Sequence, residues 1–216
     1  DLTPSAEPRP VPAELCVELD ARLAADGTVL RPLTDTVLRD LVARVRALGP
    51  EAVAVNLLYS WLDDRHERRV AEALGAALGP GVFVTRSSFV LPEYREYERG
   101  IATWLNAWLG PRVQGYLERL RGALAPSSLA VMQSAGGTME AEVAATRAVN
   151  LLLSGPAGGV AGARHLGQLE GSERLLTFDM GGTSTDVALV DGEPPLAAEG
   201  RIGPWPVAVP MLDIHT

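Results

Sequence analysis

The segment LLTFDMGGTSTDVALVDG, residues 175–192, places glycine, hydroxyl and carboxylate side chains between two short apolar stretches. The apolar stretches, 175–178 and 187–190, flank a Gly-Gly pair, and this pattern predicts a β-hairpin whose turn is 180–185. A hairpin that serves only the fold needs little more than a tight turn such as Asn-Gly. The additional polar groups of residues 179–186 therefore indicate a binding function, with a polar but purely structural turn as the alternative.

The residue types in this turn suit a phosphate group and a metal ion. Gly181 and Gly182 carry no Cβ, so backbone N–H groups can turn inward and form a nest for an anion. Three hydroxyl donors follow: Thr183, Ser184 and Thr185. Asp179 is expected to hold Mg²⁺, directly or through its waters, because hard oxygen ligands suit that ion. Asp186 stands at the other shoulder, and the two aspartates are the candidate catalytic carboxylates.

A second glycine-rich stretch, SGPAGGVAGA, covers residues 154–163. The preceding VNLLLSG, 149–155, reads as a strand that leads into a helix here, and a helix N-terminus attracts anions. The stretch lacks the Gly-x-Gly-x-x-Gly order of the dinucleotide fingerprint. Three interpretations stay open: a phosphate contact, a hinge, or small residues that let the helix pack closely on a sheet.

The charge balance and the residue inventory exclude several classes of protein. The formal net charge is −8 and no basic run occurs, so nucleic acid is not an expected partner. All 19 basic residues are arginine, which removes a Walker-type Gly-Lys loop, a Schiff-base lysine and a Ser–Lys dyad. The single cysteine, Cys16, excludes an intrachain disulfide and a cysteine-based zinc cluster. A bound phosphate must therefore be held by backbone N–H groups, hydroxyls, arginine or metal.

Length and hydropathy place the chain among soluble proteins. A hydrophobic fraction of 47% over 216 residues is enough for one large domain or two small ones. No apolar run approaches the roughly 20 residues that span a bilayer, and the polar, proline-rich start is unlike a signal peptide. We expect a cytoplasmic protein with no membrane partner. The first residue is not methionine and the final MLDIHT ends without a capping helix, so we also expect a piece of a longer protein.

Other polar residues carry weaker signals. Ser154 does not stand in a Gly-x-Ser-x-Gly nucleophile elbow. The three histidines show no metal-ligand spacing: His66, His165 and His215. Asp213 and His215 share one side of an expected strand. The cluster EYREYERG, 93–100, interleaves acids and arginines, either as an ion-paired helix start or as an active-site or interdomain network.

The apolar periodicity predicts an α/β fold with a β-rich C-terminal part. A hairpin turns at Asp26-Gly27, and a helix capped by Thr34 or Asp35 runs to about Leu48. A helix that starts at Asp63 or Asp64 and runs to about Leu78 lies between two apolar strands, and the short links favour a parallel crossover. These strands are 52–60 and 82–90.

Helical spacing then continues over residues 92–124, with a break or kink expected at Gly110-Pro111. Residues 129–134 read as a further strand before the turn at Gly136-Gly137.

Several segments in series resemble the large-subunit type of the hydantoinase A/5-oxoprolinase family. In chain order they are AVAVNLLYSW, HERRVAEAL, LPEYREYERGIATWLNAWLGPRV, VMQSAGG, LLLSGPAGGVAGA and FDMGGTSTDVALV. The match covers most of the chain from about residue 30 onward. The family belongs to the ATPase superfamily of actin, sugar kinases and heat-shock chaperones.

The resemblance implies a partial actin-like ATPase fold, in which two ribonuclease H-like lobes clasp Mg-ATP and each contributes a phosphate hairpin. Residues 1–125 are then the later part of the first lobe, and residues 126–216 are the start of the second lobe. Residues 179–186 would be the second lobe's hairpin, so the implied cofactors are ATP and Mg²⁺. The first lobe's hairpin has no counterpart in this sequence.

The resemblance also implies an activity, namely ATP-dependent opening of a cyclic amide such as a hydantoin or 5-oxoproline. The expected partners are this substrate and a second, hydantoinase B-type subunit or domain. Two alternatives stay open: a subunit of an ATP-dependent acetone or acetophenone carboxylase, and a non-catalytic nucleotide-binding or assembly module. With one hairpin alone, the chain itself is expected to be inactive.

Overall fold

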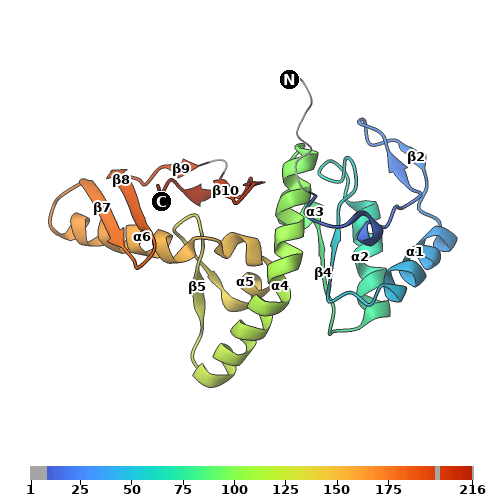
Figure 1. Ribbon diagram of the computed structural model, residues 1–216, viewed down its shortest axis with the longest axis horizontal. Helices are drawn as coiled ribbons and strands as arrows, with labels where there is room; N and C mark the ends of the chain where they lie inside the picture. Colours follow the sequence, from blue (N-terminus) through green and yellow to red (C-terminus); the bar gives the residue numbers. More distant parts are fainter. Residues whose placement is uncertain (1–8, 198–199, 216) are drawn as a thin grey trace. The chain divides into compact units, whose positions relative to one another are not determined.

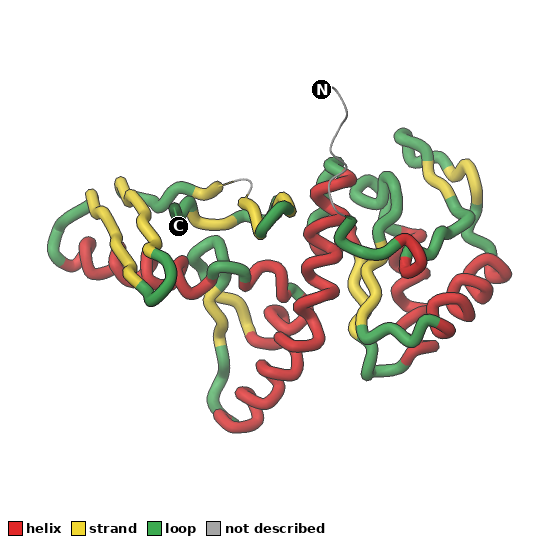
Figure 2. The backbone as a smooth tube through the Cα atoms, in the orientation of Figure 1, coloured by secondary structure: helices red, strands yellow, loops and turns green. Residues whose placement is uncertain are grey.

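The structure is a computed structural model that describes residues 9–197 and 200–215 (Figure 1). The chain divides into two compact units, each described by itself. The first unit comprises Asp1–Pro111 with Arg201–Val207, and the second comprises Arg112–Gly200 with Ala208–Thr216. Figure 2 shows helices and short strands in both units, which is the predicted α/β class. No helix among the described residues is long and apolar enough to cross a membrane.

The first unit is built on one parallel strand pair with helices packed against it. Its elements are η1 (Ala13–Leu15), β1 (Arg22–Leu23), β2 (Val29–Arg31), α1 (Asp35–Ala47), β3 (Ala52–Val55), α2 (Arg65–Leu78), β4 (Phe83–Arg86), α3 (Ser87–Val90), the N-terminal half of α4 (Glu96–Leu124), β10 (Gly200–Ile202) and β11 (Trp205–Val207). β3 and β4 pair in parallel from Ala52↔Phe83 to Val55↔Arg86, so the predicted strand–helix–strand crossover is confirmed.

Local sequence accounts for the start of this unit. β1 and β2 form the expected hairpin, and Gly27 takes the left-handed φ of 81° that its turn requires. Thr34 caps α1, because its side-chain oxygen accepts the Val37 N–H at 3.3 Å. One apolar cluster joins α1 and α2 to the β3–β4 pair. Its buried members are Leu33, Leu41, Val45, Val55, Val70 and Leu74.

The second unit contains the segment that carries the candidate site. Its elements are the C-terminal part of α4, β5 (Ala130–Met132), β6 (Thr138–Glu140), α5 (Ala141–Thr146), η2 (Ala148–Leu151), α6 (Ser154–Leu169), β7 (Arg174–Met180), β8 (Thr185–Asp191), β9 (Leu196–Ala197) and β12 (Met211–Leu212). β7 and β8 form an antiparallel hairpin, and α6 packs along it (Figure 1).

Three predicted strands differ from the structure. Residues 149–155 form no strand; η2 and a turn occupy them, and α6 already begins at Ser154. The Ser134 hydroxyl holds this turn by donating to the carbonyls of Asn150 and Leu152, an arrangement that only the folded chain creates. The strand expected over 82–90 ends at Arg86, since Ser87–Val90 is helical. β3 likewise stops at Val55, short of the expected 60.

A break or a kink was expected at Gly110-Pro111, and the break is wrong, because α4 continues through both residues. Proline costs the helix one backbone hydrogen bond, but α4 buries Ile101, Ala102 and Leu105 on its way to this point, and that packing offsets the loss. Gly110 is needed for a different reason. A Cβ built on it would lie 2.4 Å from the Phe83 ring, so the ring lies flat against the helix backbone.

This close approach predicts opposite effects for two glycine substitutions in α4. Gly110→Ala should lower the free energy of unfolding by about 1–3 kcal/mol, because the Phe83 ring must move from the helix. Gly122→Ala, where a Cβ would meet nothing within 4 Å, should raise it by about 0.5–1 kcal/mol through helix propensity alone. Urea denaturation followed by circular dichroism measures both. Equal stability of the two variants would contradict the packing described.

Candidate functional site

The hairpin that carries the candidate residues forms as predicted, with a slightly shorter turn. Its strands pair in unbroken antiparallel register from Arg174↔Asp191 to Met180↔Thr185. Only residues 181–184 lie outside the ladder, and the Gly181 N–H donates to the Ser184 carbonyl at 2.9 Å. The expected turn of 180–185 therefore loses one residue at each end to strand pairing.

Asp179 and Asp186 are directly opposed near the turn end of the hairpin, one residue pair before the last pair, Met180↔Thr185. Directly opposed residues of an antiparallel pair have their Cβ atoms about 5 Å apart, and like charges in that position repel. Asp179 is exposed and Asp186 half-buried, so both carboxylates are within reach of solvent ions. Two opposed carboxylates at the end of a hairpin are therefore suited to share a cation, which would remove their repulsion.

The two aspartates lie on the face of the hairpin that packs on α6. Side chains alternate along a strand, so Asp179 shares a face with Leu175, and Asp186 shares one with Ala188 and Val190. These apolar residues belong to one cluster with Ala157 and Val160 of α6. The carboxylates thus continue the core-facing side of the hairpin to the point where the buried cluster ends.

The contacts between hairpin and helix run in order toward the N-terminus of α6. Gly167, near the helix C-terminus, meets Leu175 at the start of β7, and Arg164 Nε donates to the Gly192 carbonyl after β8. Nearer the turn, the buried cluster unites Ala188 with Ala157. Following this order, we infer that the aspartate pair lies toward the first turn of α6.

The first turn of α6 presents backbone N–H groups that are available to an anion. Leu153 precedes it in a left-handed conformation with φ 57°, which is uncommon for a residue other than glycine, and no side chain caps the helix. The N–H groups of a helix start carry partial positive charge. A Cβ on Gly155, Gly159 or Gly162 would meet nothing within 4 Å, so close packing does not explain these glycines.

The glycines of the hairpin turn do not form the predicted nest in this structure. Neither Gly181 nor Gly182 has a left-handed φ, and the Gly181 N–H is already used by the turn. A Cβ on Gly182 would meet nothing within 4 Å, and on Gly181 only the Ser184 carbonyl at 3.5 Å. Neither backbone conformation nor packing therefore requires these glycines, which leaves room beside Asp179 for a group from outside the chain.

The oxygen donors of this site suit a Mg²⁺ ion that is bound together with a phosphate group. They suit less well a metal ion that is coordinated by protein side chains alone. Among residues 9–197 and 200–215, no three His, Cys, Asp or Glu side chains gather as a metal-binding group. Mg²⁺ commonly binds through one or two carboxylates and completes its shell with waters and substrate phosphates. Asp179 and Asp186 would hold it, with the hydroxyls of Thr183, Ser184 and Thr185 and the start of α6 available to phosphate oxygens.

Asp213 and His215 are not part of this arrangement. His215 pairs with Val187 on β8 through two backbone hydrogen bonds of 2.8 and 2.9 Å. Val187 points to the face opposite Asp186, so His215 and Asp213 point away from the carboxylate pair, while Ile214 between them packs on the core. Elsewhere, burial and the nearby Arg65 lower the pKa of His66, which is therefore neutral at pH 7.

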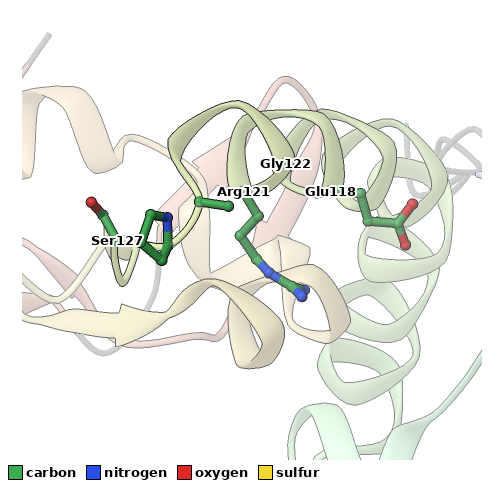
Figure 3. A pocket seen from close by; sticks show the side chains of 6 residues that line it. Glu118, Arg121, Gly122 and Ser127 are labelled. Carbon is green, nitrogen blue, oxygen red and sulfur yellow. The ribbon is translucent and has the colours of Figure 1, made fainter.

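Two open hollows of the second unit lie away from the hairpin turn. One, of about 380 Å³, lies at the end of α4 and is shown in Figure 3. It is lined by Glu118, Arg121, Gly122, Ala125, Pro126 and Ser127. Arg121 is paired with Glu142 at 3.2 Å. The other, of about 600 Å³, surrounds Gln168 to Arg174 at the opposite end of the hairpin from Gly181. Neither contains a candidate catalytic group.

The acid and arginine cluster at 93–100 belongs to a buried network in the first unit. Arg99 is fully buried, and its guanidinium donates to the Ser87 hydroxyl at 3.0 Å and to the Glu93 and Leu57 carbonyls at 2.7 and 2.9 Å. Ser87 in turn donates to Glu67, also fully buried, at 2.6 Å. The ion-paired interpretation describes Arg95 and Glu98, which are 2.9 Å apart, and it also describes the core residue Arg99, whose Nη2 lies 3.4 Å from Glu96 Oε1.

Both carboxylate oxygens of Glu67 accept hydrogen bonds in this network. Oε1 accepts from the Leu57 N–H at 2.8 Å besides Ser87, and Oε2 accepts from both the N–H and the hydroxyl of Ser88. Sequence reasoning missed this residue, since it lies within an ordinary amphipathic helix. The only local signal was an acid on the buried side of α2, at the position after His66.

Comparison with known proteins agrees with this architecture. The hydantoinase/oxoprolinase family matches residues 99–216, and its N-terminal region matches residues 6–78. Caprolactamase subunit alpha of Pseudomonas jessenii is 32% identical over 213 residues, which cover 95% of this chain and 30% of that protein. 5-Oxoprolinase 1 of Arabidopsis thaliana is 34% identical over 194 residues, 87% of this chain and 15% of that protein.

Two solved structures share the fold. The crystal structure of ATP-dependent caprolactamase from Pseudomonas jessenii has a TM-score of 0.79 at 30% identity, over 90% of this chain and 29% of that one. The nucleotide-free structure of acetone carboxylase, described for ATP-dependent acetone carboxylation, has a TM-score of 0.77 at 27% identity, over 90% and 28%.

These likenesses define an α/β protein that holds part of the actin-like ATPase fold. The chain belongs to the hydantoinase/oxoprolinase family. It spans about 30% or less of the relatives named above.

The buried network predicts a large loss of stability for Glu67→Gln. Glutamine turns one acceptor oxygen into a donor, which must face an existing N–H or hydroxyl donor. It also removes the buried negative charge that is linked to Arg99 through Ser87, so that Arg99 keeps only its pairing with Glu96 at 3.4 Å among the described ion pairs. The free energy of unfolding should fall by about 3 kcal/mol or more. Glu72→Gln, an exposed change on the same helix, should stay within about 0.5 kcal/mol of the parent. If both variants unfold at the same urea concentration, the network does not support the fold.

Proposed function

We propose that this chain is part of an ATP-dependent cyclic amidohydrolase, in which the β7–β8 hairpin binds the phosphates and the metal ion of Mg-ATP. The observation that carries the proposal is the opposed pair Asp179 and Asp186 beside a turn whose two glycines leave open space. The uncapped start of α6 on the same side supports it, because it offers further N–H donors to an anion.

The proposed chemistry is phosphorylation of the amide oxygen of the ring. The amide oxygen attacks the γ-phosphorus and ADP leaves, which makes the ring carbon electrophilic. Water then adds to this carbon, and the ring C–N bond breaks as the nitrogen takes up a proton, which leaves a linear acyl phosphate. A second water hydrolyses the acyl phosphate to the carboxylate and inorganic phosphate. Bound Mg²⁺ would supply charge neutralisation for the transferred phosphoryl group. The chain's own share is positional. Asp179 and Asp186 fix the cation, and Thr183, Ser184 and Thr185 orient phosphate oxygens so that charge is stabilised where it develops.

In the longer protein, we propose residues 1–125 as the later part of a first lobe and residues 126–216 as the start of a second. The specific partner we propose is a second, hydantoinase B-type subunit, which the subunit name of the caprolactamase relative supports. The cyclic amide itself is proposed by class, because relatives act on rings of different size, as their names caprolactamase and 5-oxoprolinase say.

A second candidate is a subunit of an ATP-dependent ketone carboxylase, favoured by the likeness to acetone carboxylase. Both candidates use the hairpin in the same way and differ in the acceptor of the phosphoryl group. The longer protein with its partner subunit distinguishes them. ATP consumption that depends on 5-oxoproline, a hydantoin or a lactam supports the amidohydrolase, whereas consumption that depends on bicarbonate and a ketone supports the carboxylase. Nucleotide binding without either turnover would leave only an assembly module.

Asp179 and Gly182 have different parts in the proposed site, so substitutions of these two residues in the longer protein should cause different defects. Asp179→Asn should lower ring opening by about two orders of magnitude, because the charge that holds the cation is lost, while nucleotide affinity changes little. Gly182→Val should instead weaken nucleotide binding, because it fills space that is open in the folded chain. Steady-state kinetics and isothermal titration calorimetry separate these effects. Small and equal effects of both changes would mean that the loop is only a turn.

The chain alone should hydrolyse ATP at a negligible rate. One phosphate hairpin leaves the γ-phosphate half solvated, and positioning accounts for most of the catalysis in phosphoryl transfer. A coupled assay for ADP release, with Asp179→Ala as the blank, measures this. Robust Mg-ATPase activity that Asp179→Ala abolishes would show that the chain holds a complete site and that the proposed division into lobes is wrong.

A further inference from the structure

An aromatic surface of the first unit is not used by the proposed function. It consists of Trp61 and Tyr94, carried by the loop after β3 and the segment before α4. Tyr94 is 69% exposed and Trp61 38% exposed, and their rings meet edge to face with centroids 6.4 Å apart. Tyrosine and tryptophan in such positions are typical of the centres of protein interfaces.

The fully buried Arg99 holds both segments of this surface in place. Its Nη2 donates to the Leu57 carbonyl in the first segment, and its Nη1 donates to the Glu93 carbonyl in the second. Glu96 adds a further tie, because its Oε1 accepts the Tyr59 N–H at 3.3 Å. A surface that is fixed before binding loses little conformational entropy when a partner arrives.

The chemistry of the surface favours a guanidinium group. Within the chain, the Arg22 guanidinium carbon already lies 6.0 Å from the centroid of the Tyr59 ring. Glu93 is exposed next to Tyr94, and its carboxylate forms no ion pair with any described arginine or histidine. An arginine that stacks on an aromatic face and reaches a carboxylate uses both features at once. Nucleic acid would also stack on these rings, but the net charge of −8 disfavours binding of its polyanionic backbone.

We propose that Trp61 and Tyr94 with Glu93 form a docking surface for arginine side chains of a partner polypeptide. This surface is independent of the phosphate hairpin, so the proposal does not rest on the proposed function. A lysine-rich partner should bind more weakly than an arginine-rich one. The planar guanidinium stacks on an aromatic ring, whereas the compact ammonium does not.

The direct test titrates the ¹⁵N-labelled chain with the peptide acetyl-Gly-Arg-Gly-Arg-Gly-Arg-amide. The control peptide carries citrulline, a neutral isostere, in place of each arginine. The indole N–H signal of Trp61, assigned with Trp61→Phe, should shift in a saturable manner with the arginine peptide. The citrulline peptide should bind at least about tenfold more weakly.

Two matched variants locate the binding. Tyr94→Ala should weaken the arginine peptide about fivefold or more, whereas Tyr116→Ala, also an exposed tyrosine at 56%, should leave the affinity unchanged. Glu93→Gln should weaken binding about threefold and reduce its dependence on salt. The dispersion of the same spectra shows whether each variant remains folded.

Several results would overturn the proposal. Equal affinity for the arginine and citrulline peptides would remove the cationic basis. Equal losses in the Tyr94 and Tyr116 variants would place the binding elsewhere. A dimer of the chain in light scattering that Tyr94→Ala dissociates would make a second copy the occupant. Shifts of the Trp61 signal by oligothymidylate, but not by the peptide, would make it a nucleic-acid surface.

Discussion

The candidate site depends on the packing of one face of the β7–β8 hairpin against α6. Ala157 and Val160 of the helix meet Ala188 and Val190 of β8 in a buried cluster. A two-stranded hairpin is at best marginally stable in water without such support. The same packing decides that Asp179 and Asp186 lie on the helix side, because a register shift of one residue would turn both to the other face. Small side chains on α6 therefore position carboxylates with which they make no bond.

The first unit depends in a similar way on a buried network of hydrogen-bonded polar groups. Glu67 and Arg99 are both fully buried and are linked through the Ser87 hydroxyl, so each has hydrogen-bond partners in place of water. Such a network is costly when one member is missing. Because its donors and acceptors include backbone groups of Leu57, Ser88 and Glu93, it fixes loops at the carboxyl end of the parallel pair. Loops held in this way present their outward side chains in one arrangement.

The sequence predicted the parts of the fold that local patterns govern. Apolar flanks around Gly181-Gly182 indicated the hairpin, Thr34 indicated a helix start, and alternating elements indicated the parallel pair. The resemblance to the hydantoinase/oxoprolinase family, drawn from motifs in series, is confirmed by the family match. The roles of Asp179, Asp186 and residues 181–185 stay predictions.

The remaining features depend on contacts between distant residues. VNLLLSG is as apolar as a strand, and only the Ser134 hydroxyl bonds reveal the turn that ends in α6. Gly110-Pro111 resembles a helix end, yet the Phe83 ring packs flat on a continuous helix. Glu67 has no distinctive neighbours in sequence, since its partners lie on α3 and in the loop after β3. No local pattern encodes such pairings.

The claim that the hairpin binds the metal and phosphates of a nucleotide is tested most directly by locating a metal ion. Crystals of the longer protein grown with Mn²⁺ and a non-hydrolysable ATP analogue would show the ion by its anomalous scattering. We expect an anomalous peak at the Asp179 and Asp186 carboxylates, with phosphate oxygens at residues 181–185. A fully occupied metal–nucleotide site elsewhere in the protein, with this hairpin in contact with neither ion nor phosphate, would contradict it.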